Sequence, residues 1–242
     1  GEMPLGLRAW PGARREADFT GERIDRLRRQ KQLPWESFAV LFRANAQSRA
    51  LEMAMREQLI PYRMVGTKSF FDRREAKDLL AYLQVMDNPD ADLHLLRILN
   101  TPPRGISPAT ASFAIDWSRE NKKSLWATLL DLSFLSECST RSQNAINSFT
   151  ELITRFGTEF AESERSFADI LADLIREVGY EEFLTRTCTT EDERMRRLSA
   201  IDDIKVALRQ FWLPGHKLTD FLACISLDDE RDDEDIEKKS GV

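Results

Sequence analysis

Apolar residues recur every three or four positions through most of this chain, and this helical spacing is the strongest constraint on its fold. From residue 70 to residue 227 such stripes follow one another with short breaks. In the stripe over residues 167–178, Ser166 is placed to cap the start of a helix and Gly179 to end it. Another stripe covers residues 198–211. We therefore predict a purely helical region here.

The first 67 residues show a different pattern, in which short apolar runs alternate with helical stretches. The run at residues 38–42 (FAVLF) is too short for a helix, so it predicts a buried strand, and residues 62–65 (YRMV) predict a second one. A further short strand is expected at residues 5–10. Helices are predicted at residues 16–31 and 46–59. The predicted fold class is mainly α, with a helical domain attached to a small α/β segment.

The charge of the chain is unevenly distributed. The 242 residues have a formal net charge of −6, but residues 228–237 (DDERDDEDIE) alone carry −7, which leaves +1 for the rest. The acidic total therefore does not exclude a DNA-binding face. We predict three parts: an α/β segment at residues 1–67, a helical domain at residues 68–227, and an acidic tail or linker at residues 228–242.

Several kinds of site lack the residues they need. Cys138, Cys188 and Cys224 are widely spaced and odd in number, and His94 and His216 lie in no ligand-spaced cluster, so we predict neither a disulfide framework nor a metal site. No apolar run approaches the roughly 20 residues of a membrane span, and the N-terminus lacks the apolar core of a signal peptide. We predict a cytoplasmic protein with no membrane partner.

The junction at residues 100–110 (NTPPRGISPAT) combines helix breakers with a cation. Its prolines end one helix, Gly105 permits a turn, and Ser107 followed by proline is typical of the start of the next helix. An arginine beside an exposed helix N-terminus indicates a phosphate site. The side chains available for it are those of Thr101, Arg104, Ser107 and Thr110. The alternative is a rigid turn that carries a solvated arginine.

A second candidate site is the predicted strand-to-helix turn at residues 42–49 (FRANAQSR). It places hydrogen-bond donors at the C-terminal edge of a strand, where open α/β sheets bind ligands. These donors suit a phosphate backbone or base edges. They are Arg43, Asn45, Gln47, Ser48 and Arg49. The alternative is a capped helix with a polar first turn.

A third candidate is the segment at residues 68–78 (KSFFDRREAKD). It pairs Phe70 and Phe71 with nearby cations that include Arg73 and Lys77. Aromatic rings beside cations are one means of stacking single-stranded bases. The alternative is that the rings are core residues in front of a salt-bridged helix start.

The sequence contains no GxxxxGK[ST] phosphate loop, no nucleophile elbow and no HExxH motif. We therefore predict no self-contained active site and no cofactor bound by this chain.

Taken together and in order, the three candidate segments resemble the UvrD/Rep/PcrA family of superfamily 1 DNA helicases. Residues 39–52 (AVLFRANAQSRALE) resemble the family motif [YF]-R-x-N-x-Q-S-R. Residues 65–83 (VGTKSFFDRREAKDLLAYL) resemble V-G-x-x-x-F-F-x-R-x-E-I-K-D. Residues 92–110 (DLHLLRILNTPPRGISPAT) resemble L-x-R-I-x-N-x-P-x-R-G-I-G. Spacing and order agree over residues 38–110, and the rest matches in helical character.

The resemblance implies that residues up to 67 belong to the second RecA-like motor domain and that the helical remainder is its mobile accessory domain. It implies contacts of Arg43 and Asn45 with single-stranded DNA. It also implies contacts with the duplex backbone ahead of the fork, from the turn formed by Arg104, Gly105, Ile106 and Ser107. The parent protein is then an ATP-dependent 3′-to-5′ DNA helicase that uses ATP and Mg²⁺.

The chain departs from the family pattern at several points. Ser107 stands where the family usually has glycine, and Ala76 where it usually has isoleucine. A serine still permits a helix cap and a hydrogen bond to phosphate. The Walker motifs, the adenine-stacking segment and the arginine finger have no counterparts here, so the chain resembles a fragment that hydrolyses no ATP.

Two alternatives stay open. The first is a fragment of a helicase-nuclease subunit of the RecB/AddA kind, which a nuclease domain in the parent protein would distinguish. The second, from a different class, is a non-enzymatic helical module that binds proteins.

Overall fold

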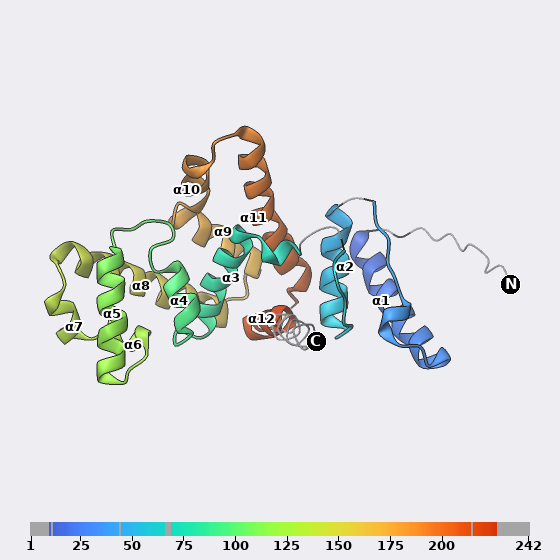
Figure 1. Ribbon diagram of the computed structural model, residues 1–242, viewed down its shortest axis with the longest axis horizontal. Helices are drawn as coiled ribbons and strands as arrows, with labels where there is room; N and C mark the ends of the chain where they lie inside the picture. The colour runs from blue at the N-terminus through green and yellow to red at the C-terminus, as the bar shows by residue number, and fades with distance from the viewer. Residues whose placement is uncertain (1–9, 11, 44, 66–68, 214, 227–242) are drawn as a thin grey trace, which may run out of the picture. The chain divides into compact units, whose positions relative to one another are not determined.

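The computed structural model describes residues 10, 12–43, 45–65, 69–213 and 215–226, and these residues form helices and connecting segments but no strand (Figure 1). They divide into two compact units, Gly1–Ser69 with Cys224–Val242 and Phe70–Ala223. The predicted acidic tail lies outside the described residues, as does most of the strand predicted at residues 5–10.

The first unit is built on a pair of helices, α1 (Ala13–Lys31) and α2 (Asn45–Glu57), with a short 3-10 turn, η1 (Trp35–Ser37), between them. The two helices lie side by side in Figure 1 and pack through small side chains. The buried cluster consists of Ala17, Ala50 and Ala54, with Leu51 packed against it. Both helices were predicted from the sequence, and both are confirmed.

The two strands predicted in this unit are not observed among the described residues. Residues 38–42 and 62–65 have no strand structure, and the run at residues 38–42 is not buried as expected. The side chain of Leu41 is 95% exposed and that of Val65 is 80% exposed. A strand needs a neighbouring strand to satisfy its backbone N–H and C=O groups, and none is present among the described residues. The α/β part of the predicted fold is therefore not observed.

The second unit is helical throughout its described residues, as predicted. Its elements are η2 (Phe70–Asp72), α3 (Arg74–Asp87), α4 (Asp92–Ile98), α5 (Pro108–Asn121), α6 (Leu125–Leu129), α7 (Leu132–Glu137), α8 (Thr140–Glu162), α9 (Phe167–Glu177), α10 (Tyr180–Thr187), α11 (Glu191–Phe211) and, starting within it, α12 (Leu218–Ser226). The helix caps predicted at Ser107, Ser166 and Gly179 are confirmed.

Helix α3 is the centre of this unit, because it packs against α4, α8 and α11. Its Leu79, Tyr82 and Leu83 are fully buried. The long helix α8 crosses it at very short range: a Cβ on Gly157 would lie 3.0 Å from the carbonyl oxygen of Met86. A glycine inside a helix costs stability, and here it permits the close approach of the two backbones.

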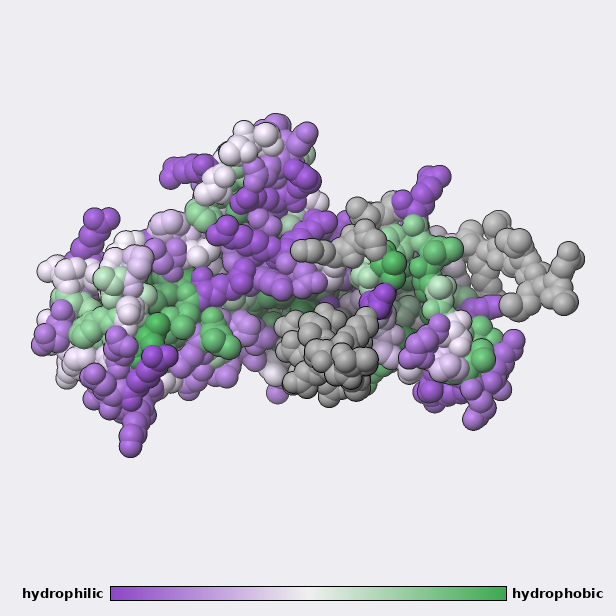
Figure 2. All heavy atoms as spheres, viewed as in Figure 1, coloured by the Kyte–Doolittle hydropathy of each residue, from purple (hydrophilic) through white to green (hydrophobic). Residues whose placement is uncertain are grey.

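The surface of this unit is not uniform. Figure 2 shows polar side chains over α11, whereas hydrophobic side chains reach the surface near α4. Leu93 at the start of α4 and Leu130 at the end of α6 are 83% and 51% exposed.

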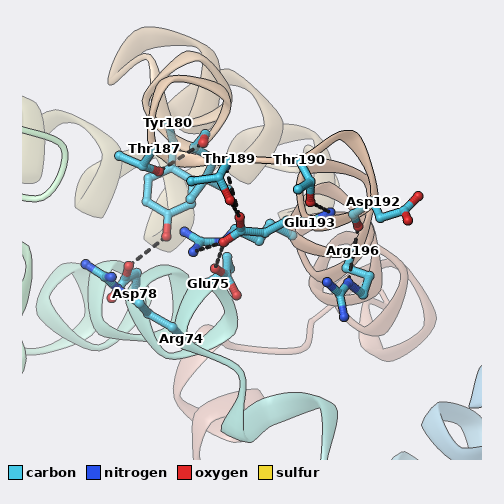
Figure 3. A network of polar contacts seen from close by, with 12 residues as sticks. Arg74, Glu75, Asp78, Tyr180, Thr187, Thr189, Thr190, Asp192, Glu193 and Arg196 are labelled. Carbon is cyan, nitrogen blue, oxygen red and sulfur yellow. Dashed lines mark hydrogen bonds and ion pairs between the residues drawn. The ribbon is translucent and has the colours of Figure 1, made fainter.

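A polar network around buried Asp78 and Glu75 fastens α3 to α10 and α11 (Figure 3), and Arg97 of α4 also joins it. The hydroxyl of Tyr180 donates a hydrogen bond of 2.7 Å to Asp78 Oδ2, and Arg97 Nε donates one of 2.7 Å to Asp78 Oδ1. On the next turn of α3, Glu75 faces Arg197 of α11 at 3.5 Å. Burial raises the pKa of Tyr180, and the nearby charge of Asp78 raises it further, so the phenol stays a neutral donor.

We expect Tyr180→Phe to lower the free energy of unfolding by about 1–2 kcal/mol, because a buried carboxylate oxygen loses its donor while Arg97 still pairs with the other oxygen. Urea denaturation followed by circular dichroism measures this. The control is Thr185→Val on the exposed face of the same helix, where only a local hydrogen bond to the Glu181 carbonyl is lost. Equal midpoints for the two variants would show that the network does not stabilise the fold.

Candidate nucleic-acid interface

The turn between α4 and α5 is held rigidly by hydrogen bonds from Arg104. Its backbone N–H donates to Asn100 Oδ1 at 2.9 Å. Its guanidinium donates to the carbonyl oxygens of Ile98 at 2.9 Å and Leu99 at 3.3 Å. These are carbonyls at the C-terminal end of α4, which lack partners within the helix and attract a cation. Arg104 therefore caps α4.

The same guanidinium joins the turn to α3 and α8. It lies 4.7 Å from the ring centre of Phe149 on α8 and hydrogen-bonds the hydroxyl of Tyr82 on α3. That hydroxyl in turn donates a 2.6 Å bond to the Thr101 carbonyl. Burial raises the pKa of Tyr82, and the arginine partly offsets this effect. The cation that the sequence singled out thus faces inward.

Two further residues of the turn have structural roles. Gly105 has φ of +95°, a conformation that residues with a Cβ rarely adopt. Ile106 is only 1% exposed, so its side chain belongs to the core. The side chain of Ile106 is therefore not available to a ligand.

Hydroxyl groups link the N-termini of α5 and α8. The Oγ of Ser107 accepts from the backbone N–H of Thr110 at 3.1 Å and lies 2.9 Å from its Oγ1. Thr110 Oγ1 lies 3.2 Å from Ser142 Oγ, to which Ser139 Oγ donates at 3.1 Å. Ser107 and Ser139 are the N-caps of the two helices. The positive ends of two helix dipoles therefore meet at one place, which favours an anionic ligand.

An arginine that the sequence analysis did not select stands beside this meeting point. Arg141 is the second residue of α8 and is exposed. A Cβ on Gly105 would lie 3.5 Å from its Nε, so the arginine reaches the turn. A cation at a helix N-terminus is unfavourable by about 0.3–1 kcal/mol. Ser139 indicates in the sequence where the helix of Arg141 begins, but the position of Arg141 next to residue 105 depends on a tertiary contact.

A groove of about 410 Å³ opens next to the turn. Its lining comes from the turn, from one face of α8 and from the end of α9. The polar lining residues are Arg104, Arg141, Asn144, Ser148 and Glu177. The structure thus brings together the turn residues predicted from the sequence and adds the face of α8 to them.

The candidates from the first motif lie in the other unit. Arg43 is exposed, and its backbone N–H donates to Gln47 Oε1 at 3.2 Å across the start of α2. Gln47 and Arg49 are half-buried and have interaction partners. The side chain of Asn45 lies outside the part that the structure describes. The arrangement leaves Arg43 as the accessible cation of this group.

In the third candidate segment, the described side chains follow the alternative given with it, a buried ring in front of a salt-bridged helix start. Phe71 is only 4% exposed. Arg73 lies 3.4 Å from Asp203, and Lys77 pairs with Asp72 at 3.0 Å. Stacking of a base on Phe71 would require the ring to leave the core, so this segment adds no accessible aromatic surface through Phe71.

Among the residues that the structure describes, no group of three or more His, Cys, Asp or Glu side chains is arranged to hold a metal ion. None of the described helices is both long and apolar enough to cross a membrane.

We expect Arg104→Ala to lower the free energy of unfolding by about 2–4 kcal/mol, because the buried end of α4 and the hydroxyl of Tyr82 lose charged donors. Urea denaturation measures the loss. The control is Arg119→Ala, which removes an exposed arginine at the other end of α5 and should cost about 0.5 kcal/mol or less. If Arg104→Ala were as stable as this control, the capping role would be wrong.

Comparison with known proteins agrees with the resemblance. A family model described as the UvrD-like helicase C-terminal domain matches residues 3–241. The ATP-dependent DNA helicases Rep of Salmonella typhimurium (strain LT2) and Escherichia coli (strain K12) are 35% and 36% identical over 170 residues, or 70% of this chain. The ATP-dependent DNA helicase PcrA of Staphylococcus aureus (strain Mu50) is 33% identical over 230 residues, or 93% of the chain.

The chain spans 25% of the length of both Rep proteins and 30% of that of PcrA. The family model, in contrast, covers almost every residue of the chain. Because the match includes all three motifs and the helical remainder, the chain belongs to the UvrD-like helicase C-terminal domain family.

Proposed function

We propose that this chain is the DNA-binding C-terminal part of an ATP-dependent DNA helicase that moves 3′ to 5′. Its relatives carry the name ATP-dependent DNA helicase, and its sequence holds two of the family's DNA-contacting motifs. ATP and Mg²⁺ are bound by other parts of the parent protein, because this sequence has no GxxxxGK[ST] loop to hold nucleotide phosphates.

The second unit contacts the backbone of duplex DNA through the turn between α4 and α5. The observation that carries this proposal is the convergence of the two helix N-termini beside the turn, joined by the hydroxyls of Ser107, Thr110 and Ser142. Helix N-termini and hydroxyls are common phosphate ligands in protein–DNA complexes. In this arrangement Arg104 and Gly105 set the shape of the turn.

The first unit contacts single-stranded DNA at the start of α2. Arg43 is exposed there, and Gln47 holds its backbone, while Asn45 and Arg49 complete the donor set given by the family motif. The exposed Leu41 and Val65 support the proposal that this unit is part of a larger motor domain. Apolar runs of this kind suit strands of a RecA-like sheet that the rest of a longer protein completes.

Two alternatives make different predictions. A helicase-nuclease subunit would have the same DNA contacts and a nuclease domain elsewhere in the parent chain. A module that binds only proteins would leave the turn without a role in DNA binding, and its partner would bind equally well at high salt.

The first test is a fluorescence-anisotropy titration of the 242-residue chain with a 3′-tailed duplex at two salt concentrations. We expect binding that weakens as salt rises, because each neutralised phosphate contributes about −0.9 to the slope of log K against log salt. An absence of binding at low salt would contradict the proposal and favour the protein-binding module.

The second test is an ATPase assay of the same chain with and without single-stranded DNA. We expect no hydrolysis in either case, since the phosphate-binding loop is missing from the sequence. Hydrolysis that is stimulated by single-stranded DNA and retained after further purification would contradict this, because the chain itself would then contain the ATP-hydrolysing site.

A further inference from the structure

The cation best placed to meet a DNA phosphate at the turn is Arg141. It is exposed, and its side chain forms no ion pair or hydrogen bond with any residue that the structure describes. Arg104, in contrast, is fully engaged with the carbonyls of Ile98 and Leu99 and with the ring of Phe149. The two arginines line the same groove but are oriented for different tasks.

Arg141 begins a polar stripe on α8. Asn144 and Ser148 follow it at intervals of three and four residues, so the three side chains lie on one face of the helix. All three are exposed and line the groove beside the turn. Neither Asn144 nor Ser148 has a side-chain partner within the described residues, so their hydrogen-bonding groups are available to a ligand.

The position of Arg141 in its helix is unfavourable for folding. It lies in the first turn of α8, where the helix dipole repels a cation and attracts an acid. The neighbouring α11 follows the favourable pattern, with Glu191, Asp192 and Glu193 in its first turn. A residue that opposes helix stability, has no partner in the described part of the chain and borders a groove is better explained by binding than by folding.

We propose that Arg141, Asn144 and Ser148 form a contact strip for the phosphodiester backbone of duplex DNA. Arg141 pairs with a phosphate next to the turn, and the amide and hydroxyl donate to phosphate or sugar oxygens along the groove. Arg104 is a positioning residue that holds the turn against this strip. The inference rests on the proposed duplex contact and adds its cationic residue and its direction along α8.

Charge limits the strip at its far end. Glu177 lines the groove where α9 ends, and a carboxylate there repels phosphate. Arg155 pairs with Glu177, so this end of the groove has no net positive charge. The favourable part of the groove is therefore the part next to Arg141.

The decisive experiment compares Arg141→Glu with Arg119→Glu in the same anisotropy titration with a 3′-tailed duplex. The two variants change the net charge equally, and Arg119 is also exposed but lies about 16 Å along α5 from its start. We expect Arg141→Glu to weaken binding about tenfold or more at low salt and to reduce the salt slope by about 1. Arg119→Glu should stay within about twofold of the wild type.

Stability gives an independent readout. A glutamate at the second residue of α8 is favoured by the helix dipole, so Arg141→Glu should melt at or above the wild-type temperature while it binds less well. A structural residue would lose stability and binding together.

Asn144→Ala should weaken binding about threefold with an unchanged salt slope, whereas Asn147→Ala, outside the groove, should have no effect.

The outcomes separate the two proposals. If the wild type does not bind the duplex, the proposed function fails and this inference fails with it. If the wild type binds and Arg141→Glu matches Arg119→Glu, the duplex contact stands and the strip on α8 is wrong. Weaker binding by Arg141→Glu with a lowered melting temperature would also overturn it, because the effect would then come from misfolding.

Discussion

The contacts of the Arg104 guanidinium hold the helices together around the turn between α4 and α5. The guanidinium caps the carbonyl end of α4, hydrogen-bonds Tyr82 of α3 and stacks on Phe149 of α8, so one side chain fixes three helices. Because α3 also packs against α11, this side chain is connected through α3 to the centre of the unit. The groove beside the turn has a defined shape for the same reason, since the turn and α8, which both line it, are tied to this group.

Ion pairing distinguishes the surfaces of this unit more clearly than the number of charges does. On α11, Arg194 pairs with Glu191 and Arg197 with Glu193, so these arginines are neutralised within their own helix. Among the residues that the structure describes, none pairs with Arg141 at the start of α8 in this way. An unpaired cation next to two helix N-termini gives a local positive potential in a chain whose net charge is −6. The total charge is therefore a poor guide to where an anion binds.

The helices of this chain were predictable because their signals are local: apolar periodicity, N-cap serines and a C-terminal Gly179 lie within one or two turns of each helix. The strands were not, because a strand depends on neighbours that the described residues do not supply, and Leu41 is left exposed. At the candidate site, the turn was recognised from its prolines and glycine. The inward direction of Arg104 and the approach of Arg141 to Gly105 depend on packing between segments more than 20 residues apart, and local sequence carries no signal for that.

A binding face of this composition favours contact with the DNA backbone over reading of bases. Ser107 and Thr110 are short, and their hydroxyls are already engaged with one another and with Ser142, so they present oxygens close to the protein surface. Reading a base edge requires side chains that extend into a groove and donate in a fixed pair, as bidentate arginine does. Arg141 is the one long donor of the proposed strip, and a single cation next to helix N-termini is matched to a phosphate. In the proposed helicase this independence of sequence is a requirement, because the duplex ahead of the fork changes with every step.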